Sequence, residues 1–281
     1  MPGYLERRLR AGETAGVVLF GPNVPVAAGA RRLTAAIQRA ADGEALIAAD
    51  QEGGAVRTLR FADSPRELAA TGVNVNLAPV ADVAGPDSVM AGRAFPADVP
   101  ARVVAASRAL LAFGVLPTVK HFPGFGRATE NTDDAPVTID ATRAELNTDI
   151  APFRASIDAG VPLVMASHAL YPALDAEQIA SQSPAVLQEL LRAELGFEGV
   201  VMTDSLEAEA VLARSSVEVA AERSLAAGAD LLLMTGRGSW IRVFPHLLRR
   251  ARRSPALRAR ISESAARVDR LRARLGPRAR R

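Results

Sequence analysis

The sequence predicts an α/β fold, because short apolar stretches alternate along the chain with longer stretches of helical periodicity. The apolar stretches have the length of buried strands, and polar residues gather where they end. The chain has 281 residues, 49% of them hydrophobic, and no cysteine, so it can bury one large core without disulfides. The predicted strands are residues 16–20, 45–49, 73–80, 115–119, 161–166, 199–203 and 230–234.

Helical stretches separate these strands. Near-continuous apolar strands joined by helices indicate a parallel sheet that is covered on both faces. No Pro/Ser-rich linker interrupts the alternation, so we predict a single domain over residues 1–281. The predicted helices are residues 27–41, 65–71, 101–113, 143–159, 184–195 and 217–227, together with most of the chain after residue 234.

Polar residues at the carboxyl ends of several strands are the pattern of a (β/α) barrel, where these ends form the active site. A doubly wound open sheet would need a longer glycine-rich phosphate loop than Gly53-Gly54. We therefore predict a (β/α)8 TIM-like barrel in which one strand is unaccounted for. The strand-end residues are Asp50, Asp82, Lys120, His121, His168 and Asp204.

The strand over residues 115–119 leads into the most informative segment of the chain. Of the 34 basic residues, 33 are arginines and the single lysine is Lys120, which is followed by His121. Lysine and arginine exchange on most surfaces but not where a compact ammonium group is needed. A Pro/Gly turn and a polar loop with several carboxylates follow, so this segment is a candidate functional site.

Seven segments together resemble glycoside hydrolase family 3, in particular its single-domain bacterial β-N-acetylglucosaminidases of cell-wall recycling. Their order and spacing cover the chain from residue 16 to about residue 235. The segments are 16–20 (GVVLF), 50–54 (DQEGG), 74–82 (NVNLAPVAD), 92–95 (GRAF), 120–124 (KHFPG), 167–172 (SHALYP) and 196–206 (GFEGVVMTDSL).

The resemblance implies an irregular (β/α)8 barrel that here lacks its first strand, a retaining glycosidase mechanism, and no metal or cofactor. It makes Asp204 the nucleophile, whereas local sequence alone favours a helix N-cap at this position. It assigns binding of the sugar hydroxyls to Asp50, Arg93, Lys120 and His121. His168 is placed with them, although a core histidine below the site is an equal alternative.

The acid/base loop departs from the family pattern. The family carries an Asp-x-His pair there, and its histidine is the acid/base, whereas this chain has Asn131, Thr132 and Asp133. We predict that Asp133 replaces the histidine, with Glu130 or Asp134 as alternatives, because glycosidases commonly use two carboxyl groups. Glu52 is expected to point away from the site.

Three functional classes follow from these observations. The first is a retaining glycosidase that removes terminal β-linked N-acetylhexosamine (N-acetylglucosamine), with β-glucosidase specificity as a variant. The second is a catalytically impaired sugar-binding relative. The third is a nucleic-acid-associated protein, suggested only by the arginine-rich residues 249–281, where helical periodicity favours an ordinary solvated helix.

We expect a small carbohydrate as the partner, no nucleic acid or membrane, and a cytoplasmic location, because residues 1–16 lack the apolar core of a signal peptide. The oligomeric state is open. A barrel without its first strand has two unpaired edges, so we expect either self-association or a cover for the gap from residues 1–13.

Overall fold

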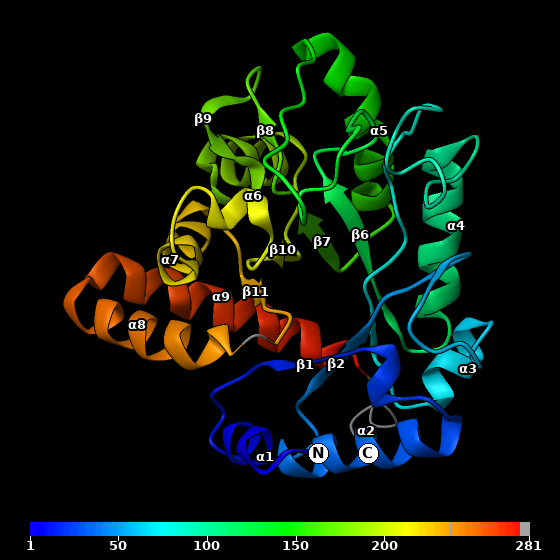
Figure 1. Cartoon of the computed structure of the whole chain (residues 1–281), viewed down its shortest axis with the longest axis vertical. Coiled ribbons are helices and arrows are strands. Elements are labelled where there is room, and N and C mark those ends of the chain that lie inside the picture. The colour runs from blue at the N-terminus through cyan, green and yellow to red at the C-terminus, as the bar shows by residue number, and fades with distance from the viewer. Residues whose placement is uncertain (237, 276–281) are drawn as a thin grey trace.

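The computed structural model describes residues 1–236 and 238–275, and its centre is a curled sheet of seven parallel strands (Figure 1). Successive strands of this sheet are neighbours, with order β1-β2-β5-β6-β7-β10-β11, which confirms the predicted strands and the TIM-like topology lacking one strand. The strands are β1 (Gly16–Leu19), β2 (Leu46–Ala49), β5 (Val75–Asn76), β6 (Leu116–Phe122), β7 (Leu163–Ala166), β10 (Val200–Ser205) and β11 (Leu231–Leu233). Two antiparallel hairpins, β3 (Gln51–Gly53) with β4 (Val56–Arg57) and β8 (Leu170–Tyr171) with β9 (Asp175–Ile179), were not predicted.

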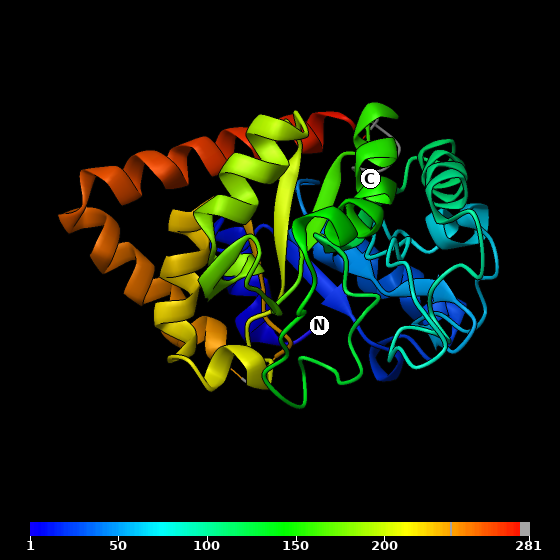
Figure 2. The same cartoon turned by 90° about the horizontal axis from the view of Figure 1, so that it is seen from above.

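Helices surround the curled sheet when it is seen from above (Figure 2). The predicted helices are present within a few residues of their expected bounds, although the stretch 184–195 forms a π-helix, η3 (Ala185–Glu194). The α-helices are α1 (Gly3–Arg10), α2 (Ala27–Ala40), α3 (Pro65–Ala70), α4 (Val99–Leu111), α5 (Arg143–Asp158), α6 (Glu209–Leu212), α7 (Val217–Ala227), α8 (Ser239–Arg253) and α9 (Pro255–Ala273). Short 3-10 turns lie at η1 (Gly21–Asn23) and η2 (Ala180–Gln182).

Local sequence explains where several helices begin. Helix α5 starts with a capping box, in which the Thr142 hydroxyl accepts from the Glu145 N–H and the Glu145 carboxylate accepts from the Thr142 N–H. Helix α9 starts with Ser254 as its N-cap and Pro255 at the first helical position. These side chains satisfy backbone donors that would otherwise lack partners.

Alternation along the strands divides the sheet into an inner and an outer face. In β2, Leu46 and Ala48 join the interior cluster, whereas Ile47 and Ala49 pack outward among the residues of α2 and α3. Strands β7 and β10 follow the same rule, so the interior is apolar up to the carboxyl ends of these strands. The inward strand residues of the interior cluster are Leu46, Ala48, Val75, Leu77, Leu116, Leu163, Met165, Val200 and Met202.

The two edges of the sheet, β1 and β11, are not paired with each other or with a further strand within the described residues. Helix α9 instead closes this side and the lower end of the interior. Its residues Val268 and Leu271, with the following Leu275, belong to the same buried cluster as the inward strand residues. An Arg272 guanidinium N–H also donates to the Ala15 carbonyl oxygen beside β1, at 3.3 Å.

Residues 1–13 form α1 and do not enter the sheet. Leu5 and Leu9 pack against α2 on the outer side of the sheet, and Arg8 lies 3.6 Å above the ring of Trp240 at the start of α8. The expectation was that this segment would cover the gap between the two sheet edges. It does so only through the contact between Arg8 in α1 and Trp240 in α8. Helix α9, which the expectation did not include, closes the interior.

Asp230 anchors α9 to the sheet. Its side chain is 0% exposed and accepts hydrogen bonds from Arg192 (2.7 Å), Arg260 (2.6 Å) and Arg267 (3.1 Å). The Ser264 hydroxyl and the Val201 N–H donate to the same carboxylate. One buried carboxylate thus joins β10, β11, η3 and α9.

We expect Asp230→Ala to destabilise the fold by roughly 2–4 kcal/mol, because removing one partner of a buried ion pair leaves the remaining charges uncompensated and these arginines keep some solvent contact. Urea unfolding measures this change. Glu263→Ala is the matched control, since Glu263 pairs with Arg260 from the same helix but is 61% exposed, and little change is expected. Equal losses for the two variants would contradict this account of α9.

Candidate active site

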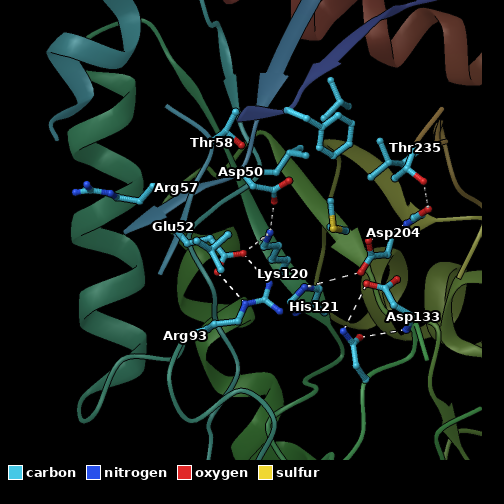
Figure 3. A pocket seen from close by; sticks show the side chains of 18 of the residues that line it. Asp50, Glu52, Arg57, Thr58, Arg93, Lys120, His121, Asp133, Asp204 and Thr235 are labelled. Atoms are coloured by element: carbon cyan, nitrogen blue, oxygen red, sulfur yellow. Dashed lines mark hydrogen bonds and ion pairs between the residues drawn. The ribbon is translucent and has the colours of Figure 1, made fainter. Parts of the chain in front are cut away.

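A cavity of about 1010 Å³ opens at the carboxyl ends of the strands (Figure 3). Its apolar floor includes Leu77 and Met165 from the barrel interior, and its polar wall comes from strand ends and loops. Most residues that the sequence placed in the site line this cavity. The lining includes Asp50, Glu52, Arg57, Thr58, Arg60, Arg93, Lys120, His121, Asn131, Thr132, Asp133, Asp134, Ser167, Asp204, Ser205, Glu207 and Thr235.

The inward alternation of the strands explains three of these positions. Ala48 in β2 and Met202 in β10 face the interior, so the residues two positions later, Asp50 and Asp204, face the same way at the strand ends. Lys120 lies at the end of β6 and is 3% exposed. Apolar layers below thus support a layer of charged side chains above.

Lys120 is the centre of a network of charges. Its ammonium group lies 2.6 Å from Asp50 Oδ1 and 2.6 Å from Glu52 Oε1, and Arg93 donates two hydrogen bonds to the Glu52 carboxylate, at 2.9 and 2.7 Å. The expectation that Glu52 points away is wrong, because residue 52 has the same strand parity as Asp50 and its side chain is 2% exposed.

This network determines the ionisation of its members. Burial by itself would raise the pKa of Glu52, but the hydrogen bonds from Arg93 and the positive charges of Lys120 and Arg93 lower that pKa to about 2. Burial would likewise lower the pKa of Lys120, yet Asp50 and Glu52 hold it above its usual value. This part of the cavity wall therefore contains the Lys120 ammonium, the Arg93 guanidinium and ionised Glu52.

His121 lies between two carboxylates. Its Nδ1 is 2.7 Å from Asp82 Oδ2, and its Nε2 is 3.9 Å from Asp204 Oδ2 (Figure 3 shows the second contact). Strand alternation would point neighbouring residues to opposite faces, but the register is irregular between Val119 and Phe122, and Lys120 and His121 both line the cavity.

Asp204 lies within β10, which continues to Ser205, and helix α6 begins only at Glu209 after the N-cap Ala208. Asp204 is therefore not a helix N-cap. Its side chain is 28% exposed, and its Oδ1 accepts from the Ser205 N–H at 2.7 Å. Burial would raise its pKa, but the Lys120 ammonium and the Ser205 N–H hold the pKa below its usual value, so this carboxylate is ionised.

Asp133 lies on the loop that follows β6, and its carboxyl group faces that of Asp204 in the cavity lining (Figure 3). The loop is held by its backbone, since the Ala210 N–H donates to the Thr132 carbonyl at 3.0 Å and the Asn131 side chain accepts from the Asp133 N–H at 3.1 Å. Partial burial and the charge of Asp204 raise the pKa of Asp133. Two facing carboxyl groups thus have pKa values shifted in opposite directions.

Residues 62–271 match the glycosyl hydrolase family 3 N-terminal domain. The chain belongs to glycosyl hydrolase family 3. A protein of Stenotrophomonas maltophilia named beta-hexosaminidase is 35% identical over 257 residues, covering 78% of this chain and 76% of the relative.

Two solved structures of this family superpose closely. The family 3 β-N-acetylglucosaminidase from a Paenibacillus species has a TM-score of 0.92 and 30% identity, with 99% of this chain aligned to 59% of that longer chain. The β-N-acetylhexosaminidase from Beutenbergia cavernae has a TM-score of 0.85 and 32% identity, covering 97% of this chain and 93% of that one.

His168 lies behind the family 3 site rather than in its wall. The side chain is 1% exposed; its Nδ1 is 2.7 Å from the Ser181 hydroxyl and its Nε2 is 2.9 Å from the Ser205 carbonyl oxygen. Both ring nitrogens are therefore occupied, and burial lowers the pKa of this histidine. The geometry favours the alternative of a core histidine, which supports the backbone next to Asp204, over direct contact with a sugar.

The sequence interpretation missed several residues that complete the site. Asp82 was noted as a strand-end residue but not assigned a role, and it contacts His121 directly. Glu207 lies three residues after Asp204. Its carboxylate accepts hydrogen bonds from the Thr235 N–H (2.6 Å) and the Thr235 hydroxyl (2.7 Å), and so holds the loop after β11. Within the described residues, no group of three or more His, Asp or Glu side chains is arranged to hold a metal ion.

We expect Glu52→Gln to be less stable than the wild type near neutral pH, by on the order of 3 kcal/mol. The pKa of Glu52 is depressed from 4.5 to about 2, so its stabilising effect is complete above about pH 4.5 and is lost as the pH falls toward 2. Urea unfolding from about pH 7 to about pH 3 measures this difference. The gap between the proteins should shrink below about pH 4.5.

Glu263→Gln is the control for this series, because Glu263 is an exposed carboxylate outside the cavity. Its stability difference from the wild type should stay small throughout. A Glu52→Gln difference that is independent of pH would show that Glu52 contributes packing and not charge.

Proposed function

We propose that this chain is a retaining glycosidase that removes terminal β-linked N-acetylglucosamine, a β-N-acetylhexosaminidase. The observation that carries the proposal is the pair of facing carboxyl groups, Asp204 with a lowered pKa and Asp133 with a raised pKa. Two carboxyl groups whose pKa values differ in this way serve as nucleophile and acid/base in glycosidases. The names of the relatives, beta-hexosaminidase and β-N-acetylglucosaminidase, support the choice of sugar.

In the first step, an oxygen of ionised Asp204 forms a bond to the anomeric carbon while the glycosidic C–O bond breaks. Asp133 gives its proton to the departing oxygen. In the second step, Asp133 removes a proton from water, the water oxygen bonds to the anomeric carbon, and the ester bond to Asp204 breaks. Two displacements at one carbon leave the product with the starting β configuration.

The charge network around Lys120 binds the sugar hydroxyl groups. Asp50 is 30% exposed toward the cavity and can accept from hydroxyl groups, whereas Lys120 and Arg93 can donate to hydroxyl oxygens. Because Lys120 and Arg93 are already held by Glu52, their donors point in set directions before the sugar arrives. Such preorganisation lowers the cost of ordering the site on binding.

Among the three acidic candidates in the loop, the geometry favours Asp133. Glu130 is exposed and is not among the residues that line the cavity, whereas Asp133 and Asp134 line it. Burial and the charge of Asp204 raise the pKa of Asp133, which favours the protonated form that an acid needs.

Hydrolysis of nitrophenyl N-acetyl-β-glucosaminide, compared with the matching β-glucoside, tests the proposal. We expect the N-acetylated substrate to be turned over faster. A preference for the glucoside would indicate β-glucosidase specificity. Binding of N-acetylglucosamine without hydrolysis of either substrate would indicate the sugar-binding relative instead.

We expect Asp204→Asn to lower kcat by at least about 1000-fold, because the amide cannot form the ester intermediate. The change is nearly isosteric and Asp204 lies in the cavity wall, so Tm should stay close to that of the wild type. Steady-state kinetics and thermal unfolding measure the two quantities. Turnover close to the wild-type value would exclude Asp204 as the nucleophile.

We expect Asp133→Ala to slow substrates with poor leaving groups far more than nitrophenyl substrates, whose phenolate departs with little protonation. Azide should partly restore turnover of nitrophenyl substrates, because it attacks the intermediate without a base. In the wild type, activity should fall as the pH rises through the raised pKa of Asp133, since the acid is lost.

Asp134→Ala is the matched control for the acid, because Asp134 lies next to Asp133 in the same loop and also lines the cavity. It should show neither the leaving-group dependence nor the azide effect. Equal losses for both substrate types in Asp133→Ala, without azide rescue, would assign Asp133 a structural role.

The setting of this activity also belongs to the proposal. We propose glycosides derived from the cell wall as substrates in peptidoglycan recycling in the cytoplasm, with no nucleic-acid or membrane partner. No helix in residues 1–236 and 238–275 is both long and apolar enough to cross a bilayer. Release of N-acetylglucosamine from purified muropeptides tests the substrate, and cell fractionation tests the location. Salt-dependent retention on DNA would reveal a nucleic-acid partner.

A further inference from the structure

Asp82 lies behind the cavity wall and is 0% exposed. Its carboxylate makes three hydrogen bonds, two with His121 at the end of β6 and one with Phe125 in the turn that follows. Oδ2 is 2.7 Å from His121 Nδ1, and Oδ1 accepts from the backbone N–H groups of His121 (3.2 Å) and Phe125 (2.7 Å). One carboxylate therefore holds both the backbone and the ring of His121.

The opposite edge of the imidazole faces the reacting groups. His121 Nε2 is 3.9 Å from Asp204 Oδ2, which is too long for a direct hydrogen bond. The distance leaves Nε2 free to contact a hydroxyl group of a bound sugar next to the nucleophile. The ring is 8% exposed, so its position is set by the protein and not by solvent.

The three contacts of Asp82 also decide where the ring carries its hydrogen. The carboxylate acts as an acceptor for two N–H groups, and the third contact is satisfied when Nδ1 carries the hydrogen and donates it to Oδ2. In a neutral imidazole, Nε2 is then an acceptor. A sugar hydroxyl group can donate to it.

We propose that Asp82 is a positioning residue, which sets the Nδ1–H tautomer and the orientation of His121 and so presents Nε2 as an acceptor to the sugar. The catalytic consequence rests on the proposed function, whereas the tautomer can be measured without activity. Asp82 itself does not touch the substrate.

Asp82→Asn separates positioning from support of the turn. The amide oxygen can still accept from the N–H groups of His121 and Phe125, so the turn keeps its bonds. The amide nitrogen, however, can only donate to Nδ1, which forces the hydrogen to Nε2. The variant keeps the backbone contacts and reverses the contact to the ring.

Nitrogen-15 NMR of labelled imidazole rings reports the tautomers directly. The chain has only three histidines, and His168 is an internal control, because its Nε2 faces the Ser205 carbonyl oxygen and requires the opposite tautomer. We expect His121 to be Nδ1–H in the wild type and Nε2–H in Asp82→Asn, with His168 unchanged. A wild-type Nε2–H tautomer, or no switch in the variant, would overturn the proposal even if the enzyme proved inactive.

Kinetics of a double-mutant cycle test the consequence. Asp82→Asn should lower kcat/KM by at least about 10-fold in the wild type but have little effect in His121→Asn, because Asp82 acts through the ring. Thermal unfolding checks that both variants fold. Equal losses in the two backgrounds would overturn the positioning role in favour of simple support for the turn.

Discussion

The buried ammonium group of Lys120 is the constraint on which the site depends. At 3% exposure, an ammonium group is stable only with partners, and Asp50 and Glu52 each lie 2.6 Å away. Glu52 in turn holds Arg93 through two hydrogen bonds, so the ends of β2 and β6 and the Arg93 loop are joined by charge. An arginine would need room for a planar group with five donors, which explains why the single lysine of the chain stands here.

The charges around the site give the two carboxyl groups of the proposed mechanism different pKa values. Asp204 lies at the end of a rigid strand, where the Lys120 ammonium and the Ser205 N–H lower its pKa. Asp133 lies on a loop, where burial and the charge of Asp204 raise its pKa. The chemical difference between two aspartates therefore comes from their surroundings, and a carboxyl group can take the place that the family gives to histidine.

The architecture around the site is held by charge as well as by packing. The sheet has two unpaired edges among the described residues, and α9 closes the interior with Val268, Leu271 and Leu275. That helix is anchored by Asp230, which is bonded to Arg192, Arg260 and Arg267. The part of the arginine-rich end that packs against the sheet thus has a structural role within the described chain.

The sequence by itself determined the seven strands, most helices and the place of Asp50 and Asp204 at strand ends, because strand and helix periodicity are local properties. It also marked Lys120 and the loop that carries Asp133. Only the tertiary structure decided that Glu52 joins the ion network, that Asp82 holds His121, that His168 lies behind the site, and that α9 closes the interior. Each of these depends on contacts between residues far apart in the chain, which the local periodicity of the sequence does not encode.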